Sequence, residues 1–252
     1  MALLHVNFSS SVLGVCTNME VILPQKGSFT QTEENTYPVL YLLHGMSDDC
    51  TIWGRRTSIE RYAAKYGITV VMPSAQLSYY SDMVYGSRFF TFFSEELPAI
   101  CHDFFPRISQ KREDTFVAGL SMGGYGAFKL AMRRPEKYAF AGSLSGAMDI
   151  KNNVLHPEVW KLAFGGNDMI TGSENDLFHL SSKLKESGKE IPEFYFSCGT
   201  SDVLAFPQNE RFDAHLNEIG LSHTHERFEG GHTWEYWDEH IQDILSRLPL
   251  KK

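Results

Sequence analysis

Short, almost wholly apolar blocks recur along the chain and are separated by amphipathic ones. Residues 37–45, 68–73, 115–120 and 138–146 are apolar over a strand's length, which is typical of strands buried on both faces of a parallel sheet. Two later blocks, 193–199 and 223–231, also favour strands. Near the start, residues 5–24 alternate and contain many β-branched side chains, which predicts two antiparallel strands.

Between these blocks the apolar positions follow a helical period. Helices are expected over residues 58–67, 92–105 (despite Pro98), 121–134, 209–220 and 233–248. Strand and helix alternate, so the chain is expected to form one α/β domain over residues 1–252, with a mostly parallel sheet and helices on both faces. Residues 147–188 form a longer segment than is needed to connect strand 138–146 to strand 193–199. We expect a small helical insertion there, over the carboxyl edge of the sheet.

Composition narrows the class of protein. The 252 residues are 42% hydrophobic and 21% charged, so the chain can bury a sizeable core. A net charge of −8 argues against nucleic acid or an anionic membrane as the main partner. We see no signal peptide and no apolar stretch that would span a membrane, and the four cysteines are scattered. We therefore expect a cytoplasmic protein with free thiols; a homo-oligomer is compatible with the aromatic content, but its size is not fixed.

The segment Gly119-Leu120-Ser121-Met122-Gly123 follows an apolar strand and begins a helix. A G-x-S-x-G nucleophile elbow requires this setting, because its serine takes a strained backbone at a tight turn. The glycines remove side chains that would collide there. We expect Ser121 to be a nucleophile and the Met122 amide to face a developing oxyanion. A plain strand–helix turn is the alternative, whereas a phosphate loop would need a Lys-Ser/Thr ending that is missing here.

A serine hydroxyl needs a base, normally a histidine held by a carboxylate. In this architecture the carboxylate follows the serine along the chain and the histidine comes last. Among the ten histidines, His232 alone follows both a strand end and a Gly-Gly turn, in FEGGHTW. Asp202 lies just after strand 193–199, while its rivals Asp168 and Asp176 lie in the expected insertion. We therefore expect His232 to be the base and Asp202 its partner.

A second oxyanion donor is expected after strand 37–45, where Met46 is the first choice and the Gly45 amide the alternative. Gly45 would also let the backbone approach the substrate. Several aromatic residues are candidates for the pocket, with ordinary core packing as the alternative for each: Trp53, Tyr85 and Phe89, and also Tyr79, Tyr80, Phe90, Trp160 and Phe164. No cofactor or metal is expected, because His223 and His225 lack an obvious third ligand.

Four segments taken together resemble the esterase D / “Putative esterase” group of α/β-hydrolases: LYLLHGMSDD, SYYSDMVYGSRFFTFFSEELPAI, REDTFVAGLSMGGYGAFKLAMRRPEKY and SLSGAMD. The likeness is strongest to small bacterial tributyrin esterases and runs from about His5 to the C-terminal helix. It implies the α/β-hydrolase fold and serine carboxylesterase activity on short acyl chains. It also implies a triad of Ser121, Asp202 and His232, with Met46 and Met122 as oxyanion donors.

The same group includes S-formylglutathione hydrolases, feruloyl and acetyl xylan esterases, and mycolyltransferases. The formylglutathione branch usually carries Cys-Thr-Glu after the strand-end glycine, where this chain has Met46-Ser47-Asp48. The expectation is therefore hydrolysis of small-molecule short-chain esters. Thioester hydrolysis, feruloyl or acetyl xylan esterase activity and acyl transfer are the enzymatic alternatives. A binding module on an inactive hydrolase scaffold is the non-enzymatic one.

Overall fold

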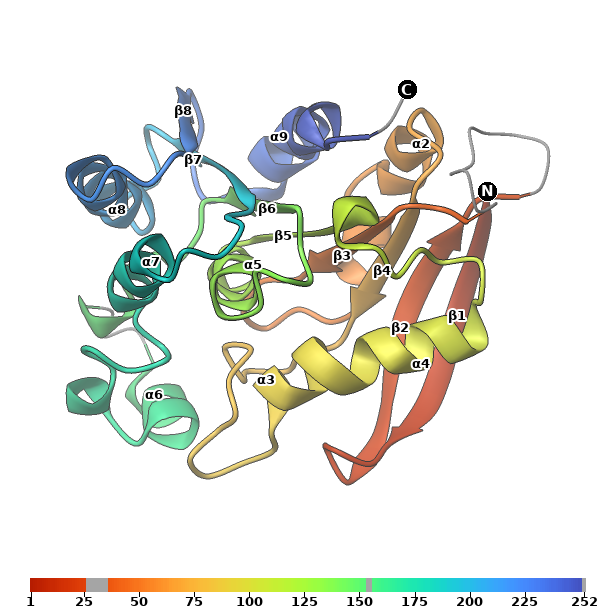
Figure 1. The fold of residues 1–252 in the computed structure, drawn as a ribbon, viewed down its shortest axis with the longest axis horizontal. Helices are drawn as coiled ribbons and strands as arrows, with labels where there is room; N and C mark the ends of the chain where they lie inside the picture. Colours follow the sequence, from red (N-terminus) through yellow and green to blue (C-terminus); the bar gives the residue numbers. More distant parts are fainter. Residues whose placement is uncertain (26–35, 153–155, 251–252) are drawn as a thin grey trace.

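One eight-stranded sheet organises the computed structural model of this chain, which describes residues 1–25, 36–152 and 156–250 (Figure 1). The strand order is β1-β2-β4-β3-β5-β6-β7-β8. Strands β1 (Ala2–Ser10) and β2 (Val15–Leu23) are antiparallel, and β2 pairs antiparallel with β4 (Thr69–Pro73). All later neighbours are parallel: β3 (Val39–Leu43), β5 (Thr115–Leu120), β6 (Phe140–Leu144), β7 (Glu193–Gly199) and β8 (Thr224–Phe228). The predicted mostly parallel sheet is thus confirmed.

Strand β3 shows why the central strands are apolar throughout. Val39, Tyr41 and Leu43 pack into the core on one face of the sheet, whereas Leu40 and Leu42 pack into the core on the other. Successive side chains of a strand point to opposite faces, so a strand covered on both sides needs apolar residues at every position.

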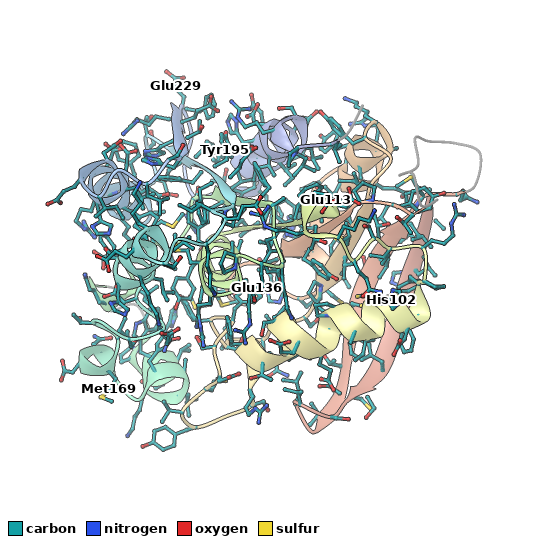
Figure 2. All side chains as sticks on the ribbon, in the orientation of Figure 1. His102, Glu113, Glu136, Met169, Tyr195 and Glu229 are labelled. Atoms are coloured by element: carbon teal, nitrogen blue, oxygen red, sulfur yellow. The ribbon has the colours of Figure 1, made fainter. Side chains whose placement is uncertain are left out.

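Helices cover both faces of the sheet. One layer contains α1 (Ile52–Arg56), α2 (Ile59–Ala64) and α9 (Trp234–Arg247). The other contains α4 (Leu97–Phe104), α5 (Met122–Arg133), α7 (Leu177–Glu186) and α8 (Phe206–Glu218). Side chains crowd the space between the sheet and these helices, whereas the labelled Met169 and Glu229 lie at the periphery (Figure 2). In the ranges described, no helix has the length and apolar character needed to span a bilayer.

The helix expected over residues 92–105 begins earlier and contains a wide turn. Its parts are α3 (Phe89–Thr91), the π-helical η1 (Phe92–Glu96) and α4. Pro98 has no amide hydrogen to donate to the carbonyl of Ser94. Lys137 Nζ donates to that carbonyl instead, so the helix continues across the proline with the carbonyl satisfied.

The segment 147–188 is helical, as expected, but its parts serve different purposes. It contains η3 (Ile150–Asn152), α6 (Pro157–Phe164), η4 (Asn167–Met169) and α7. Helix α7 packs on α5 and α8 through Leu177, Leu180 and Leu184, so it belongs to the layer that covers the sheet. The part near the strand ends is α6, whose Trp160 packs on Tyr79. Residues 153–155 of the expected insertion lie outside the described ranges.

Candidate active site

Ser121 occupies a sharp corner between β5 and α5. Its backbone angles are φ 50° and ψ −116°, a region that non-glycine residues rarely adopt, and its amide donates to the Leu144 carbonyl at 2.9 Å. A Cβ on Gly119 would lie 2.5 Å from the backbone of Gly123, and one on Gly123 would lie 2.4 Å from the Leu43 carbonyl oxygen. Both positions therefore require glycine, as the sequence predicted, because the backbones meet without room for a side chain.

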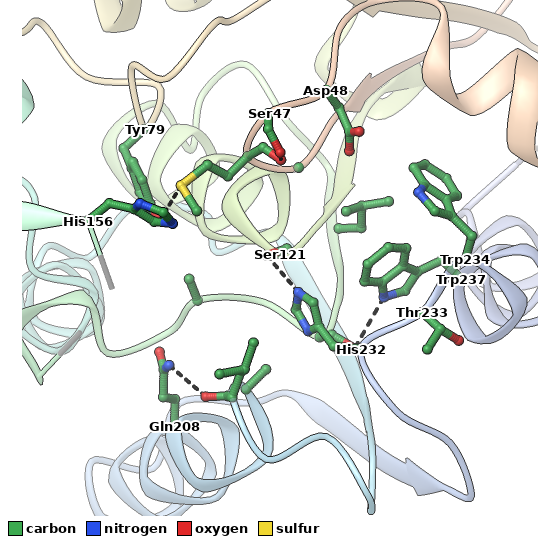
Figure 3. A pocket seen from close by; sticks show the side chains of 17 residues that line it. Ser47, Asp48, Tyr79, Ser121, His156, Gln208, His232, Thr233, Trp234 and Trp237 are labelled. Carbon is green, nitrogen blue, oxygen red and sulfur yellow. Dashed lines mark hydrogen bonds between the residues drawn. The ribbon is translucent and has the colours of Figure 1, made fainter. Parts of the chain in front are cut away.

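The structure brings together Ser121, His232 and Asp202, which were predicted as a triad; Figure 3 shows the contact between Ser121 and His232. His232 Nδ1 lies 2.7 Å from Asp202 Oδ2, and His232 Nε2 lies 3.0 Å from Ser121 Oγ. An ionised carboxylate can only accept, so Nδ1 carries the proton of the neutral ring. Nε2 is then free to accept a proton from the serine hydroxyl. Chemically, this arrangement can activate Ser121 for attack on a carbonyl carbon.

Asp202 is buried but well supplied with donors. Its Oδ1 accepts from the amides of Leu204 at 3.1 Å and Ala205 at 2.8 Å, in the turn before α8. Burial by itself raises the pKa of this carboxyl, but the hydrogen bond and charge of His232 and the two amides outweigh it. The pKa of Asp202 is therefore below its ordinary value, so the group stays ionised and orients the imidazole.

The loop after β3 lies directly on the nucleophile. A Cβ on Gly45 would be 2.6 Å from Leu120 Cδ1 and 3.7 Å from Ser121 Cβ. Burial and then the charge of Asp49 raise the pKa of Asp48, whose amide donates to the Gly45 carbonyl at 3.4 Å. This loop carries both donors predicted from the sequence, the Met46 amide as first choice and the Gly45 amide as the alternative.

The second predicted donor, Met122, is the first residue of α5. The amides in the first turn of a helix have no carbonyl partner within that helix, and they lie at its positive end. The Met122 amide is therefore suited to a developing negative charge beside Ser121.

His44 fixes the loop that carries Gly45 and Met46. Its Nε2 accepts from the Ala75 amide at 2.8 Å, so the ring proton must sit on Nδ1, which donates to the Gly45 carbonyl at 2.7 Å. Burial lowers the pKa of His44, which keeps the ring neutral. The carbonyl of His44 in turn accepts from the Tyr80 hydroxyl at 2.9 Å. Hydrogen bonds to Ala75 and Tyr80 thus hold His44 in place, and with it the loop that follows.

A pocket of about 440 Å³ opens above Ser121 (Figure 3). It lies where the parallel strands end, as ligand sites in open α/β sheets do. Its lining comes from the connections that follow β3, β4, β5, β6, β7 and β8: Gly45, Met46, Ser47, Asp48, Tyr79, Leu120, Ser121, Ser145, Ala147, His156, Leu204, Ala205, Gln208, His232, Thr233, Trp234 and Trp237.

Of the eight aromatic residues expected in the pocket, seven are absent from its described lining, including Trp53, Tyr85 and Phe89. Trp53 is fully buried in the core, where its Nε1 donates to the Leu43 carbonyl at 3.1 Å. Phe89 is also a core residue, and Tyr85 is 63% exposed at the surface. Their placement is set by the local backbone, and aromatic composition alone does not reveal it. Of the predicted pocket residues Gly45 does line the pocket, as does Tyr79 from the wider group.

Sequence reasoning missed several lining residues. His156 and Gln208 come from helix starts far apart in the chain, and no local pattern marked them. Trp234 and Trp237 could have been found, because they follow His232 at the start of α9 and helical spacing puts them on one face. The Trp237 ring lies edge-on to the His232 imidazole at 4.9 Å, and its Nε1 donates to Ser145 Oγ at 3.2 Å.

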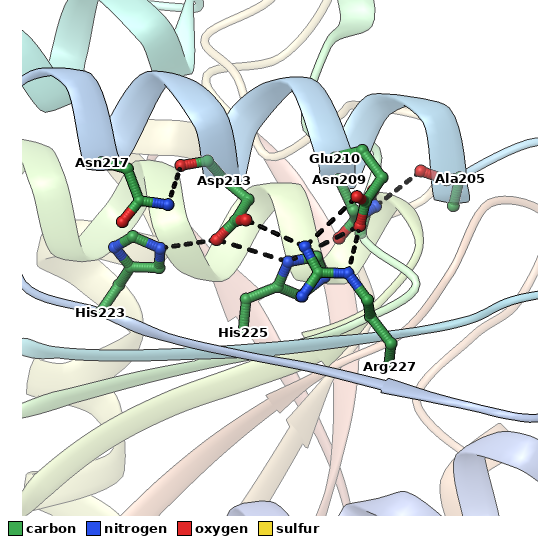
Figure 4. Close-up of polar contacts among 9 residues, drawn as sticks. Ala205, Asn209, Glu210, Asp213, Asn217, His223, His225 and Arg227 are labelled. Atoms are coloured by element: carbon green, nitrogen blue, oxygen red, sulfur yellow. Dashed lines mark hydrogen bonds and ion pairs between the residues drawn. The ribbon is translucent and has the colours of Figure 1, made fainter.

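His225 of β8 and His223, which directly precedes this strand, face α8 (Figure 4), and neither lines the pocket. His223 Nε2 lies 2.8 Å from Asp213 Oδ1, and His225 Nδ1 lies 3.5 Å from the same oxygen. Arg227 pairs with Asp213 and with Glu210. The carboxylates of α8 were not anticipated as neighbours of the two histidines. Within the described part of the chain, no three His, Cys, Asp or Glu side chains are grouped so as to hold a metal ion.

Comparison with known proteins shows the family to which the chain belongs. The family model described as “Putative esterase” matches residues 10–248. An acetyl esterase from Caldicellulosiruptor saccharolyticus is 31% identical, and the match covers 97% of each chain. Two solved structures from Staphylococcus aureus each match over 99% of both chains. They are the fluorophosphonate-binding serine hydrolase FphF (TM-score 0.91, 32% identity) and the S-formylglutathione hydrolase FrmB (TM-score 0.88, 33% identity).

These matches span nearly the whole chain, and the fold is that of the α/β-hydrolases. The chain therefore belongs to the “Putative esterase” family and is a carboxylic ester hydrolase.

Proposed function

We propose that the protein is a serine carboxylesterase that hydrolyses short-chain acyl esters through an acyl-enzyme. The observation that carries the proposal is the continuous hydrogen-bonded chain from Ser121 through His232 to Asp202 at the floor of a pocket. The similarity to an acetyl esterase supports a short acyl group.

In the proposed reaction, Ser121 Oγ attacks the ester carbonyl carbon while His232 Nε2 takes the hydroxyl proton. The amides of Met46 and Met122 stabilise the negative oxygen of the tetrahedral intermediate. The protonated imidazole, stabilised by Asp202, gives its proton to the departing alcohol. Water then attacks the acyl-enzyme, again with His232 as the base, and releases the acid and Ser121.

The pocket wall opposite the tryptophans favours small acyl groups. Tyr79 forms part of this wall, and its ring is backed by Trp160 at 4.7 Å and Phe164 at 5.8 Å. These rings are packed against one another and buried, so side chains fill the described part of the wall behind Tyr79. Acetyl and butyryl esters should therefore react faster than palmitoyl esters.

Labelling with a fluorophosphonate, combined with a panel of p-nitrophenyl esters, tests the proposal. The wild-type protein should be labelled at Ser121, whereas Ser121→Ala should lose both labelling and at least about 10⁴-fold in kcat. Ser246→Ala, which changes an exposed serine at the far end of α9, is the matched control. Absence of labelling would favour the binding-module alternative, and a preference for palmitoyl esters would contradict the assigned substrate class.

Thioester hydrolysis is the second candidate, favoured by the similarity to FrmB. A triad of this kind acts on either ester. Comparing kcat/KM for an acyl thioester with that for the oxyester of the same acid distinguishes them, after each rate is divided by the rate of hydroxide-catalysed hydrolysis. A normalised preference of more than tenfold for the thioester would make thioesters the substrate class.

A further inference from the structure

We propose that the hydroxyl of Tyr79 selects among short acyl groups, favouring chains that carry an oxygen acceptor over all-carbon chains of the same length. The inference rests on the proposed esterase function, because it assigns a partner to the acyl part of the substrate. It concerns one residue of the pocket wall that takes no part in the triad.

The Tyr79 hydroxyl differs from those of the neighbouring buried tyrosines. Tyr80 donates to the His44 carbonyl at 2.9 Å, and Tyr125 donates to the Asn175 carbonyl at 2.8 Å. Within the described ranges, the hydrogen bond found for the Tyr79 hydroxyl is to Met46 Sδ, at 3.8 Å. A thioether sulfur is a weak acceptor. Tyr79 therefore brings into the pocket an O–H donor that is only weakly satisfied.

This donor is buried and stays protonated. Tyr79 is 2% exposed, although it lines the pocket, and burial raises the pKa of its phenol. A buried donor without a strong acceptor carries a desolvation penalty, which an acceptor on a bound molecule relieves. We therefore expect tighter binding when an oxygen of the substrate replaces Met46 Sδ as the acceptor for the Tyr79 hydroxyl.

The position of the Tyr79 ring is fixed before any substrate arrives. Tyr79 and Tyr80 both have φ 50°, an unfavourable angle for aromatic residues that surrounding contacts must maintain. Ser81 Oγ donates to the Tyr79 carbonyl at 3.0 Å, and buried Lys129 of α5 donates to Ser81 Oγ. The Tyr79 ring also packs edge-to-face on Tyr125 at 5.9 Å. The donor is thus held rigidly, as selective recognition requires.

The Tyr79 hydroxyl faces the acyl part of an ester rather than the alcohol part. The departing alcohol must lie near His232, which protonates it, and Thr233, Trp234 and Trp237 flank that side of the pocket. Tyr79 and His156 lie on the opposite side of Ser121 (Figure 3). The chemical class that fits is the ester of a short acid with an ether, carbonyl or hydroxyl oxygen along its chain.

Three isosteric pairs of p-nitrophenyl esters test the inference: butanoate with methoxyacetate, pentanoate with 3-methoxypropanoate, and hexanoate with 4-methoxybutanoate. Within each pair one CH₂ becomes oxygen, and the position of the oxygen moves along the chain. The quantity measured is kcat/KM for the oxygen ester divided by that for the carbon ester. Intrinsic reactivity cancels when this ratio is compared between wild type and variant.

In Tyr79→Phe the ratio should fall about fivefold or more for at least one pair, as expected for the loss of one neutral hydrogen bond. Tyr80→Phe loses an equivalent phenol hydroxyl outside the pocket and should leave all three ratios within twofold. Met46→Leu removes the sulfur that competes for the Tyr79 hydroxyl but keeps the backbone amide at this position. It should raise the ratio for the same pair of esters. A raised ratio in Met46→Leu could not be explained by misfolding of Tyr79→Phe. The melting temperature of each variant shows whether it is folded.

Ratios that stay within twofold in Tyr79→Phe for all three pairs would overturn the inference. An equal loss for both members of every pair would overturn it too, because the hydroxyl would then support only the Met46 loop. In either case, activity on the esters and labelling of Ser121 would leave the proposed function standing. A wild-type protein with neither activity nor labelling would remove both.

Discussion

The backbone of Ser121 is strained, and its neighbours explain how the strain persists. Its amide and carbonyl are both hydrogen-bonded, the carbonyl to the amides of Tyr125 and Ala147 at 3.1 Å each. Glycines 119 and 123 allow β3, β5 and α5 to meet around it. The local conformation is therefore fixed by tertiary contacts that the G-x-S-x-G pattern implies but does not itself contain.

Asp202→Asn tests the orienting role of the carboxylate. An asparagine can keep the acceptor contact to the Leu204 and Ala205 amides, but its NH₂ group would face His232 Nδ1. The imidazole would then carry its proton on Nε2, where it can no longer accept from Ser121. We expect kcat/KM to fall by about 10⁴ at pH 7, with a melting temperature close to that of wild type. A variant that retains more than a tenth of wild-type kcat/KM would contradict this role.

The meeting of Ser121, His232 and Asp202 was predictable, whereas much of the pocket was not. Chain order and strand ends sufficed to choose Ser121, Asp202 and His232 as candidates, because a parallel sheet brings the ends of its strands to one edge. Trp53 and Tyr85 show the limit of this reasoning. Their aromatic character fitted a pocket, but burial behind β3 or exposure on a loop depends on tertiary packing that no local pattern encodes.

At the scale of elements, α5 lies unusually close to β3. Gly123 makes this approach possible, since any Cβ there would also lie 2.7 Å from the His44 carbonyl oxygen. That carbonyl lies at the end of β3, directly before the loop that carries Met46, the proposed oxyanion donor. The distance between α5 and β3 therefore sets the distance between Ser121 and this loop.

Gly123→Ala should push α5 away from β3. We expect a loss of about 2 kcal/mol or more in the free energy of unfolding, measured in urea, together with a fall in kcat/KM. Gly54→Ala in α1 is the matched control, because the nearest atom to its added Cβ is Glu20 Oε2, 3.3 Å away at the end of a side chain. Equal stability of the two variants would contradict the close approach.

The contact between β8 and α8 predicts a pH dependence of stability. His225 stacks on Phe196 at 4.2 Å, and its side chain is nearly fully buried beside Asp213, Glu210 and Arg227. Burial, and then the charge of Arg227, lower the pKa of His225. The unfolded chain, in which a histidine titrates near 6.5, therefore takes up the proton first as pH falls. Stability is present above that pH and is lost as pH falls toward the folded pKa.

His225→Phe cannot bind that proton. We expect the drop in melting temperature between pH 7.5 and pH 5.0 to be smaller in this variant than in wild type. His179→Phe, which removes an imidazole exposed in both the folded and the unfolded chain, should keep the wild-type drop. A drop in His225→Phe as large as in wild type would show that the buried imidazole does not titrate on unfolding.

Element prediction succeeded where side-chain pattern and topology agreed. The apolar strands and the glycine-bounded helices appear where expected, with ends shifted by a few residues. The π-helical turn at Phe92–Glu96 was not foreseen, nor was the contact by which Lys137 reaches the Ser94 carbonyl from another part of the chain. The sequence also did not predict that α7 belongs to the helical layer covering the sheet, because an apolar helix face does not indicate which surface it packs against.

At the scale of the whole molecule, the negative charge acts on substrates before they bind. The net charge is −8, and Asp48 adds a carboxyl at the pocket itself. A substrate with a negative leaving group approaches against this field, and salt screens the repulsion.

For 4-acetoxybenzoate we expect kcat/KM to rise about two- to fivefold between ionic strengths of 0.01 and 0.3 M. Its methyl ester has the same reacting acetate and no charge, so its kcat/KM should change by less. Steady-state rates at several salt concentrations provide the measurement. Parallel salt responses of the two compounds would show that the field does not reach the pocket.

The distance in sequence between the proposed catalytic groups has a consequence for folding in the cell. Ser121 precedes His232 by 111 residues. The two residues meet only after β6, β7 and β8 have paired in order beside β5. The last helix, α9, must also close on the sheet. Enzymatic activity should therefore appear late in folding. A newly made or refolding chain can form its helices while it is still inactive.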